Sequence, residues 1–278
     1  MDVLPRLTAV GAALLLVGCS SSSGSARPAT PSATSSPSPS SAAVDEATPT
    51  PAAADPTYLA LGDSVAAGTG AEDPARGGYV PVLADLLSDR QGCDGGQAPG
   101  CPVQVRNLAV PGATTATLLR DQLPVALDVL RGGADVRTVT VTIGGNDVFV
   151  PILRACAQQP QAPSCAEAVR AAIGDVDRGV DRLLADLTGA AGAGTTVAVM
   201  TYYDPLAACR LAPLQPLAEQ VLEGTAAADG LNDVLRARAA EHGAVLVETR
   251  GLLRTPEDFV GGLDCLHPST SGHARAFV

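Results

Sequence analysis

Five short apolar runs, each bounded by polar or turn-forming residues, are spread along the chain from residue 57 onward. Their length and their β-branched or aliphatic content are typical of strands that are buried in a parallel sheet. We expect these strands at Thr57–Leu61, Val103–Ala109, Thr138–Ile143, Thr195–Thr201 and Ala244–Glu248.

Between these runs, apolar residues recur with helical spacing, most clearly in Ala166–Leu187. We expect the other helices at Tyr79–Arg90, Thr114–Leu130 and Leu217–Glu241. Pro124 should kink or split the helix in which it lies, and Gly224 and Gly230 should soften theirs. Alternating strands and helices predict an α/β fold with three layers, in which helices cover both faces of a five-stranded parallel sheet.

The first 56 residues have a different composition. Leu7–Gly18 is an apolar stretch of about 12 residues, which suits a signal peptide over residues 1–18 and is too short to span a bilayer. Leu16-Val17-Gly18-Cys19 resembles a bacterial lipobox, which implies cleavage before Cys19 and acylation of that cysteine. The alternative is an ordinary secretory signal in which the cysteine has no such role.

Residues 19–56 are dominated by serine, alanine, proline and threonine, so we expect a disordered tether there. Residues 57–278 then form one domain with a sizeable core. We expect this domain at the outer face of a bacterial cell membrane, held by lipidated Cys19, with release as the alternative.

The charge and the aromatic content narrow the range of partners. The net charge of −11 and the pI near 4.6 argue against nucleic acid and against electrostatic binding to anionic lipid. Membrane attachment should therefore come through the anchor alone. Tryptophan is absent and aromatic residues make up 3%, so stacking platforms for sugars or bases are poorly supplied. We expect a monomer.

Six cysteines besides Cys19 are an even number in an exported chain, which points to disulfides. Their spacing suggests the local pairs Cys93–Cys101 and Cys156–Cys165, which leaves Cys209–Cys265, although the sequence alone does not choose among connectivities. No metal site is expected, because no CxxC pair occurs. Asp175–Asp186 resembles a calcium loop but has Val180 where such a loop needs glycine.

Four polar segments carry the candidate chemistry. They are Gly62-Asp63-Ser64, Asn107 to Gly112, Gly144-Gly145-Asn146-Asp147 and Asp264-Cys265-Leu266-His267-Pro268. A serine in a glycine-softened turn after a buried strand is where an α/β enzyme presents a nucleophile, and it needs a histidine nearby as base. His267 has the Asp-x-x-His-Pro context, whereas His242 and His273 lie in helices and fit structural roles.

In this order the segments resemble the blocks of the SGNH hydrolases, also called the GDSL lipases and esterases. The resemblance implies a flavodoxin-like sheet, Ser64 as nucleophile, His267 as general base and Asp264 as its acidic partner. It also implies an oxyanion hole made by Gly112, the asparagine amide of Asn146 and the backbone N–H of Ser64. Some family members use a backbone carbonyl in place of the acidic residue, so that role of Asp264 stays open.

The favoured function is an extracytoplasmic serine hydrolase that cleaves carboxylic esters as a lipase or esterase, without a cofactor. The exported, cysteine-rich pattern resembles actinobacterial secreted lipases of this family, which favours acyl lipids or simple acyl esters. An O-deacetylase acting on a carbohydrate or cell-wall polymer is the alternative. A non-catalytic binding lipoprotein is disfavoured, because a scaffold has no need for Ser64, Gly112, Asn146 and His267 together.

Overall fold

The computed structural model describes residues 55–90, 102–156, 158–159, 161–206, 215–261, 264 and 266–278. Within them, five parallel strands form one sheet in the order β2-β1-β3-β4-β5. The strands are β1 (Thr57–Gly62), β2 (Gln104–Asn107), β3 (Val136–Thr142), β4 (Thr196–Met200) and β5 (Val245–Val247). This order is that of flavodoxin-like sheets, so the prediction of a three-layer α/β fold is confirmed.

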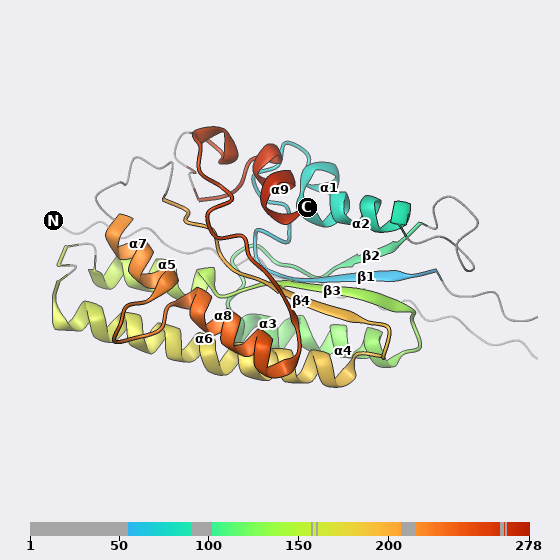
Figure 1. Ribbon diagram of the computed structural model, residues 1–278, viewed down its shortest axis with the longest axis horizontal. Helices are drawn as coiled ribbons and strands as arrows, with labels where there is room; N and C mark the ends of the chain where they lie inside the picture. The colour runs from blue at the N-terminus through green and yellow to red at the C-terminus, as the bar shows by residue number, and fades with distance from the viewer. Residues whose placement is uncertain are drawn as a thin grey trace, which may run out of the picture. The chain divides into compact units, whose positions relative to one another are not determined.

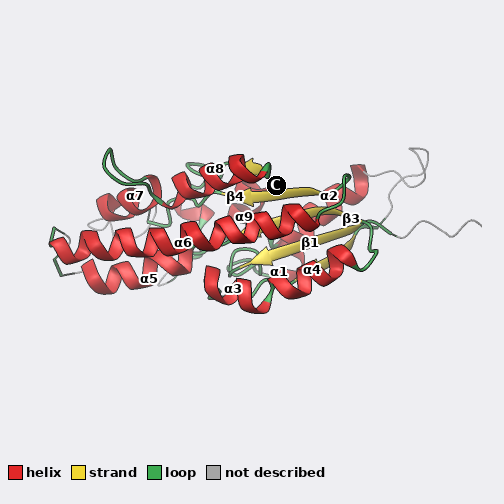
Figure 2. Cartoon of the chain, turned by 90° about the horizontal axis from the view of Figure 1, so that it is seen from below, coloured by secondary structure: helices red, strands yellow, loops and turns green. Residues whose placement is uncertain are grey.

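The helices cover both faces of the sheet (Figure 1). On one face lie α1 (Pro74–Gly77), α2 (Tyr79–Arg90) and α9 (Thr270–Phe277). Figure 2 shows the long α6, which belongs to the layer on the other face. The helices of that other layer are α3 (Thr115–Asp121), α4 (Leu123–Arg131), α5 (Gly145–Cys156), α6 (Pro163–Ala190), α7 (Gln215–Glu223) and α8 (Leu231–His242). A short 3₁₀ helix, η2 (Pro256–Asp258), precedes α9.

The hydrophobic core lies in two layers, one on each face of the sheet. The larger layer packs Leu183, Leu184 and Leu187 of α6 against Val139 and Val141 of β3. The smaller one joins aromatic side chains of α2 and α9 to the opposite face of β1. Helices on both sides explain why β1 is buried along its whole length, as its continuous apolar pattern predicted.

The two edge strands were predicted wrongly in their burial. Val103–Ala109 was expected as a buried strand, but β2 comprises only Gln104–Asn107 and is exposed throughout. It forms one edge of the sheet, where it pairs with β1 alone. Gln104, Arg106 and Asn107 give this strand the polar content that suits an edge. In β5, which was expected as buried within Ala244–Glu248, Val245 is exposed and Leu246 and Val247 are half-buried.

The expected helix Leu217–Glu241 is two helices, α7 and α8. The chain turns back on itself between them, and two glycines make this crossing possible. A Cβ atom at Gly224, whose φ is 68°, would lie 2.5 Å from the carbonyl oxygen of Ala228. A Cβ at Gly230 would lie 2.5 Å from that of Leu222, so these glycines end the helix rather than soften it.

The interruption of the helix at Pro124 is confirmed, since α3 ends before it and α4 begins one residue earlier. Helix α5 was not predicted, because Gly145 and Pro151 lie within it. A disulfide between Cys156 and Cys165 joins its end to the start of α6. The other two expected disulfides, Cys19 and the tether lie outside the described residues.

The carboxyl ends of β1 and β3 form the topological switch point, because the chain passes from β1 to β2 on one side and then from β2 to β3 on the other side of β1. Ligands of open α/β sheets bind at this position. Within the described part of the chain, none of the helices has the length and apolar character that crossing a membrane requires.

Candidate active site

The turn that follows β1 presents Ser64. Gly62 ends the strand with a φ of 143°, and a Cβ atom there would lie 2.2 Å from the carbonyl oxygen of Thr142 in β3. Only glycine allows this approach. The Gln122 side chain accepts a hydrogen bond from the Gly62 N–H at 2.9 Å and donates to its carbonyl oxygen at 2.8 Å. The start of the turn is therefore fixed on both sides of its peptide.

His267 is within hydrogen-bond distance of that serine. Its Nε2 lies 2.9 Å from Ser64 Oγ, and its Nδ1 lies 2.8 and 2.9 Å from the two carboxylate oxygens of Asp264. A carboxylate against Nδ1 requires the proton on that nitrogen, which leaves Nε2 free to accept the Ser64 hydroxyl proton. The structure brings together three residues that lie up to 203 positions apart in the sequence.

Asp264 is held by local hydrogen bonds. Its Oδ1 accepts from the backbone N–H groups of Leu266 and His267, both at 3.2 Å. Burial alone would raise the pKa of this carboxyl, but these hydrogen bonds and the His267 imidazole together hold the pKa below its ordinary value. The side chain against His267 Nδ1 is thus an ionised carboxylate, and a backbone carbonyl does not occupy that place.

Asn146 lines the same cavity as Ser64, and Gly112 directly precedes Ala113, the residue that Asn146 binds. Asn146 is in the first turn of α5, directly after β3, and one amide hydrogen of its Nδ2 binds the Ala113 carbonyl oxygen at 2.9 Å. The second amide hydrogen remains for a substrate oxygen. Gly112 has a φ of 82°, and a Cβ atom there would meet nothing within 4 Å, so the loop needs this glycine for its backbone conformation rather than for space.

Asp147 supports the oxyanion side of the site. Its carboxylate accepts from the backbone N–H of Thr115 at 3.0 Å and from the Thr115 hydroxyl at 2.6 Å, which ties α5 to the start of α3. Burial raises the pKa of Asp147, although the Thr115 hydrogen bonds oppose that shift. Asp147 therefore braces the segment that carries Asn146.

The other two histidines lie outside the site. His273 is fully buried in α9, where its Nε2 is 3.0 Å from the Thr69 carbonyl oxygen, and burial lowers the pKa of its imidazole. His242 lies at the end of α8 with its Nε2 2.8 Å from Asp181. Both have structural partners, as their sequence contexts indicated.

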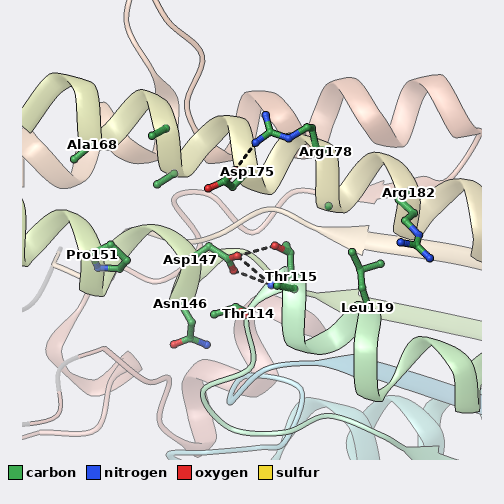
Figure 3. A pocket seen from close by; sticks show the side chains of 14 residues that line it. Thr114, Thr115, Leu119, Asn146, Asp147, Pro151, Ala168, Asp175, Arg178 and Arg182 are labelled. Carbon is green, nitrogen blue, oxygen red and sulfur yellow. Dashed lines mark hydrogen bonds and ion pairs between the residues drawn. The ribbon is translucent and has the colours of Figure 1, made fainter.

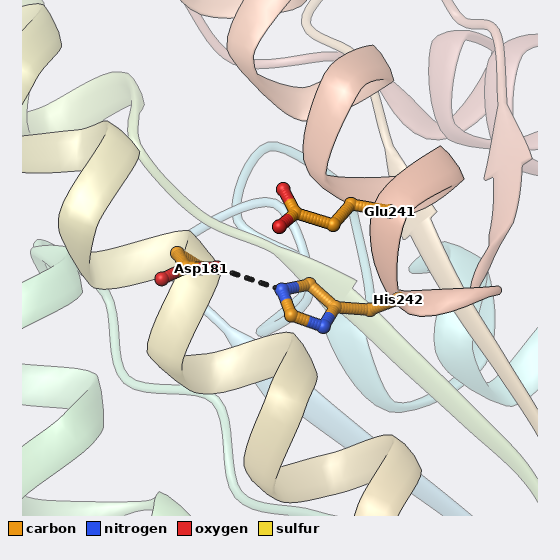
Figure 4. A group of neighbouring side chains, drawn as sticks. All are labelled: Asp181, Glu241 and His242. Carbon is orange, nitrogen blue, oxygen red and sulfur yellow. Dashed lines mark hydrogen bonds and ion pairs between the residues drawn. The ribbon is translucent and has the colours of Figure 1, made fainter.

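Figure 4 shows His242 with Asp181 and Glu241, whose ligand atoms all lie within 4.8 Å of one another. This is a group that could hold a metal ion, and the sequence did not single it out. Arg238 forms ion pairs with both carboxylates, to Glu241 at 2.5 Å and to Asp181 at 3.5 Å. The guanidinium already balances the acidic charge, so the group works as an ion-pair network that joins α6 to α8.

Ser64 and His267 line a small cavity of about 110 Å³. Aromatic and aliphatic side chains dominate its wall: Val65, Phe149, Val150, Tyr202, Tyr203, Pro205 and Leu266. Tyr203 also donates a hydrogen bond of 2.7 Å to the Leu266 carbonyl oxygen, next to His267. The cavity is apolar and has room for a small acyl group beside Ser64.

A larger and more open groove of about 710 Å³ lies on the other side of Asn146 (Figure 3). It runs between α3, α5 and α6, over small or apolar side chains that include Leu119, Ala168 and Ala172. Arg178 and Arg182 lie toward its far end, and Arg178 is paired with Asp175. Because Asn146 lines both the groove and the cavity, the two meet at the oxyanion side of the site.

Sequence reasoning missed Gln122, Tyr202 and Tyr203. Gln122 lies between two helices and carries no motif, so nothing in the sequence pointed to it. Tyr202 and Tyr203 follow the buried strand β4 after one intervening residue, at the same edge of the sheet as Ser64 and Asn146. Polar aromatic residues at the carboxyl end of a parallel strand are a usable signal of a site.

Comparison with known proteins identifies the family of the chain. The family model described as GDSL-like Lipase/Acylhydrolase matches residues 60–275. No curated protein sequence matches the chain.

Three solved structures illustrate the similarity in fold. The extracellular lipase of Streptomyces rimosus is 21% identical, with a TM-score of 0.55 over 80% of this chain and 96% of that one. Phospholipase A1 of Streptomyces albidoflavus is 20% identical, with a TM-score of 0.54 over 81% and 97%. An acetylxylan esterase of Geobacillus stearothermophilus is 18% identical, with a TM-score of 0.52 over 81% and 92%. At these identities the likeness concerns the fold alone.

Proposed function

Because the chain belongs to the GDSL-like lipase/acylhydrolase family, and so to hydrolases that act on esters, we propose that it cleaves carboxylic esters through an acyl-Ser64 intermediate. The observation that carries this proposal is the hydrogen-bonded series from Ser64 Oγ to His267 Nε2 and from His267 Nδ1 to Asp264. A serine hydroxyl becomes a nucleophile when such a base takes its proton.

In the proposed acylation step, Ser64 Oγ attacks the ester carbonyl carbon as its proton passes to His267 Nε2. The carbonyl oxygen becomes an oxyanion, for which the N–H groups of Ser64 and Gly112 and the Asn146 amide are the donors. The intermediate then expels the alcohol, which takes its proton from His267. Asp264 stabilises the imidazolium in between, and it does not itself become protonated.

Deacylation repeats these steps with water in place of the serine. His267 removes a proton from the water, whose oxygen attacks the acyl carbon, and the proton then returns to Ser64 as the acid leaves. Every proton in the cycle is handled by His267 Nε2. The proposed reaction therefore needs no group beyond those of the chain, and we expect activity to survive EDTA.

The two cavities suggest how an ester is placed. The apolar cavity of about 110 Å³ suits a short acyl group, whereas the open groove can hold a longer chain or the alcohol part. An acyl lipid or a simple acyl ester remains the favoured substrate class, since the extracellular lipase and the phospholipase A1 have the same fold. The small cavity also fits acetyl, and the acetylxylan esterase shares the fold, so an O-deacetylase is the second candidate.

Hydrolysis of p-nitrophenyl esters of graded acyl length separates these candidates, with Ser64→Ala as the control for background hydrolysis. Turnover of medium or long acyl chains supports the lipid-ester proposal, and turnover of acetyl esters alone supports the deacetylase. If no ester is turned over above the Ser64→Ala background, the catalytic proposal is wrong and a binding lipoprotein is the better account.

We also propose that processing exposes Cys19 and that its acylation attaches the enzyme, as a monomer, to the outer face of the membrane. Support comes from Leu16-Val17-Gly18-Cys19 and the serine- and proline-rich segment that follows. Stable attachment takes more than one acyl chain. Cys19→Ala should release the protein into the medium or block its processing, and unchanged membrane fractionation would contradict the proposal.

A further inference from the structure

Asp63 is a carboxylate that the proposed reaction does not use, although it directly precedes the nucleophile. It is 1% exposed, and none of the ion pairs among the described residues involves it. A buried carboxylate without a cation is destabilising unless hydrogen bonds satisfy it. The hydrogen bonds of Asp63 therefore indicate its role in the structure.

Three donors converge on this carboxylate. Oδ1 accepts from the backbone N–H of Val65 at 2.9 Å and from the Thr142 hydroxyl at 3.4 Å. Oδ2 accepts from the hydroxyl of Tyr202, 139 residues away in the sequence. The Val65 bond closes the turn around Ser64, so whatever holds Asp63 also holds the nucleophile.

Tyr202 is itself fixed at its backbone. The fully buried Asn232 accepts from the Tyr202 N–H at 2.7 Å and donates to the Tyr202 carbonyl oxygen at 2.9 Å. The same amide donates to Glu223 at 2.6 Å. Residues at the start of α8 and the end of α7 thus fix the backbone position from which the Tyr202 side chain extends.

The ring of Tyr202 then packs against the oxyanion side of the site. A Cβ atom on Gly145 would lie 2.7 Å from Cε1 and 3.1 Å from Cζ of the ring, so the contact needs glycine at that position. Gly145 directly precedes Asn146. One side chain therefore touches both the nucleophile turn, through Asp63, and the segment that carries the amide donor.

We propose that Tyr202 and Asp63 are positioning residues that form a buried bridge between the Ser64 turn and the Gly145–Asn146 segment. The bridge keeps the nucleophile and the oxyanion donor at a constant separation while the carbonyl carbon changes geometry. It rests on the proposed ester hydrolysis for its catalytic consequence, but the mechanical link is a property of the fold. Small displacements in such an arrangement cost activity steeply.

The ionised form of Asp63 is the one that accepts from all three donors. Burial raises the pKa of Asp63 to about 6, while the hydrogen bonds from Tyr202, Val65 and Thr142 oppose that rise. The titratable groups that act on it are Tyr79 of α2, Tyr202 and Tyr203 after β4, and His267. Loss of the Tyr202 hydroxyl removes one of the interactions that favour the charged form, so the pKa of Asp63 should rise further.

Tyr58 provides a matched control. Like Tyr202 it is a buried tyrosine whose hydroxyl binds another side chain, Thr140 Oγ1 at 2.7 Å. It is the second residue of β1, and its hydroxyl binds neither Asp63 nor Gly145. Tyr58→Phe and Tyr202→Phe therefore delete the same atom from a buried ring, and only the second deletion breaks the bridge.

The first experiment compares the steady-state kinetics of the two variants on the best p-nitrophenyl ester. Tyr202→Phe should lower kcat by roughly 10–100-fold with KM within about twofold, because the ring that lines the cavity remains. Its acid limb of kcat against pH should move to higher pH. Tyr58→Phe should keep kcat within about threefold and leave the acid limb in place. A wild-type kcat and acid limb in Tyr202→Phe, or an equal loss of kcat in Tyr58→Phe, would overturn the proposal.

The second experiment does not depend on turnover. Amide hydrogen exchange should become faster in Tyr202→Phe at residues 62–66 and at 145–147 together, and at neither segment in Tyr58→Phe. Unchanged exchange at both segments would overturn the bridge even in an active enzyme. Faster exchange in both segments of a protein that hydrolyses no ester would support the bridge and count against the proposed function, so the two failures are distinguishable.

Discussion

Asp63 directly precedes Ser64 and Asp264 binds His267 Nδ1, and the two carboxylates have very different surroundings. Asp63 is enclosed by the core, and burial raises the pKa of its carboxyl to about 6. The Asp264 side chain is 42% exposed, and its hydrogen bonds with His267 and neighbouring N–H groups bring the pKa of its carboxyl below the ordinary value. Asp63 accepts two of its three hydrogen bonds from groups distant in sequence, whereas Asp264 is held by its own loop.

The contrast shows that the nucleophile and its base are positioned in different ways. The nucleophile turn is part of the core, because Gly62, Gln122 and Tyr202 fix it from three separate parts of the chain. The base and its partner belong to a surface loop whose internal hydrogen bonds set their geometry. At neutral pH we therefore expect changes in the loop to affect chemistry more than stability, and changes around Asp63 to affect both.

The largest effects should follow from removing the reacting groups. Ser64→Ala and His267→Ala should each lower kcat on the order of 10⁴–10⁶-fold, because the nucleophile or its base is lost. His242→Ala is the matched control, since that histidine lies at the α6–α8 contact and should leave kcat unchanged. Circular dichroism and steady-state kinetics check both points, and a comparable loss in the control would contradict the assignment of His267.

Asp264→Ala comes next. With the carboxylate directly on His267 Nδ1, we expect kcat to fall by about 10³–10⁴-fold, while the melting temperature changes little because the loop is exposed. Asp186→Ala, at an exposed ion pair on α6, should leave kcat unchanged. A loss of less than about tenfold in Asp264→Ala would mean that another group orients the imidazole.

Asn146→Ala should lower kcat by about 10²–10³-fold with a smaller change in KM, because its free amide hydrogen serves the oxyanion rather than the bound ester. Steady-state kinetics over a range of substrate concentration separates the two constants. If KM rises while kcat is retained, Asn146 binds the ground state and is not an oxyanion donor.

The two carboxylates should also contribute to stability with opposite dependence on pH. Because the pKa of Asp63 is raised to about 6, its protonated carboxyl stabilises the fold below about pH 4. This contribution of up to about 3 kcal/mol to the free energy of unfolding is lost as pH rises through about 6. Wild type should therefore lose stability relative to Asp63→Asn over this range. Since the pKa of Asp264 is lowered, wild type should instead lose stability relative to Asp264→Asn as pH falls below about 4. Urea unfolding at several pH values tests the two signs, and equal signs would contradict the comparison.

The smallest effect concerns a disulfide remote from both carboxylates. Replacing Cys156 and Cys165 by serine opens a loop with a sequence separation of 9, which should destabilise the fold by about 2–3 kcal/mol and leave kcat unchanged. Denaturation and kinetics of the double variant check this. A change in kcat would show that the α5–α6 connection reaches the site.

Local pattern predicted the parts of the site that local structure determines. The run before Gly62 predicted β1 and the turn after it, and the Asp-x-x-His spacing of residues 264–267 placed the carboxylate within reach of the imidazole. The contact between Tyr202 and Asp63 joins two strand ends 139 residues apart, which no local pattern contains. For the same reason the crossing of the chain at Gly224 and Gly230 was interpreted as one softened helix.

The most direct test of the account is to label the protein with a serine-directed phosphonate ester and to map the modified residue by mass spectrometry. Phosphonylation of one equivalent of Ser64 in wild type, lost in Ser64→Ala and slowed in His267→Ala, is the predicted result. Labelling that persists undiminished in Ser64→Ala, or that maps to another residue, would contradict the central claim that Ser64 is the nucleophile.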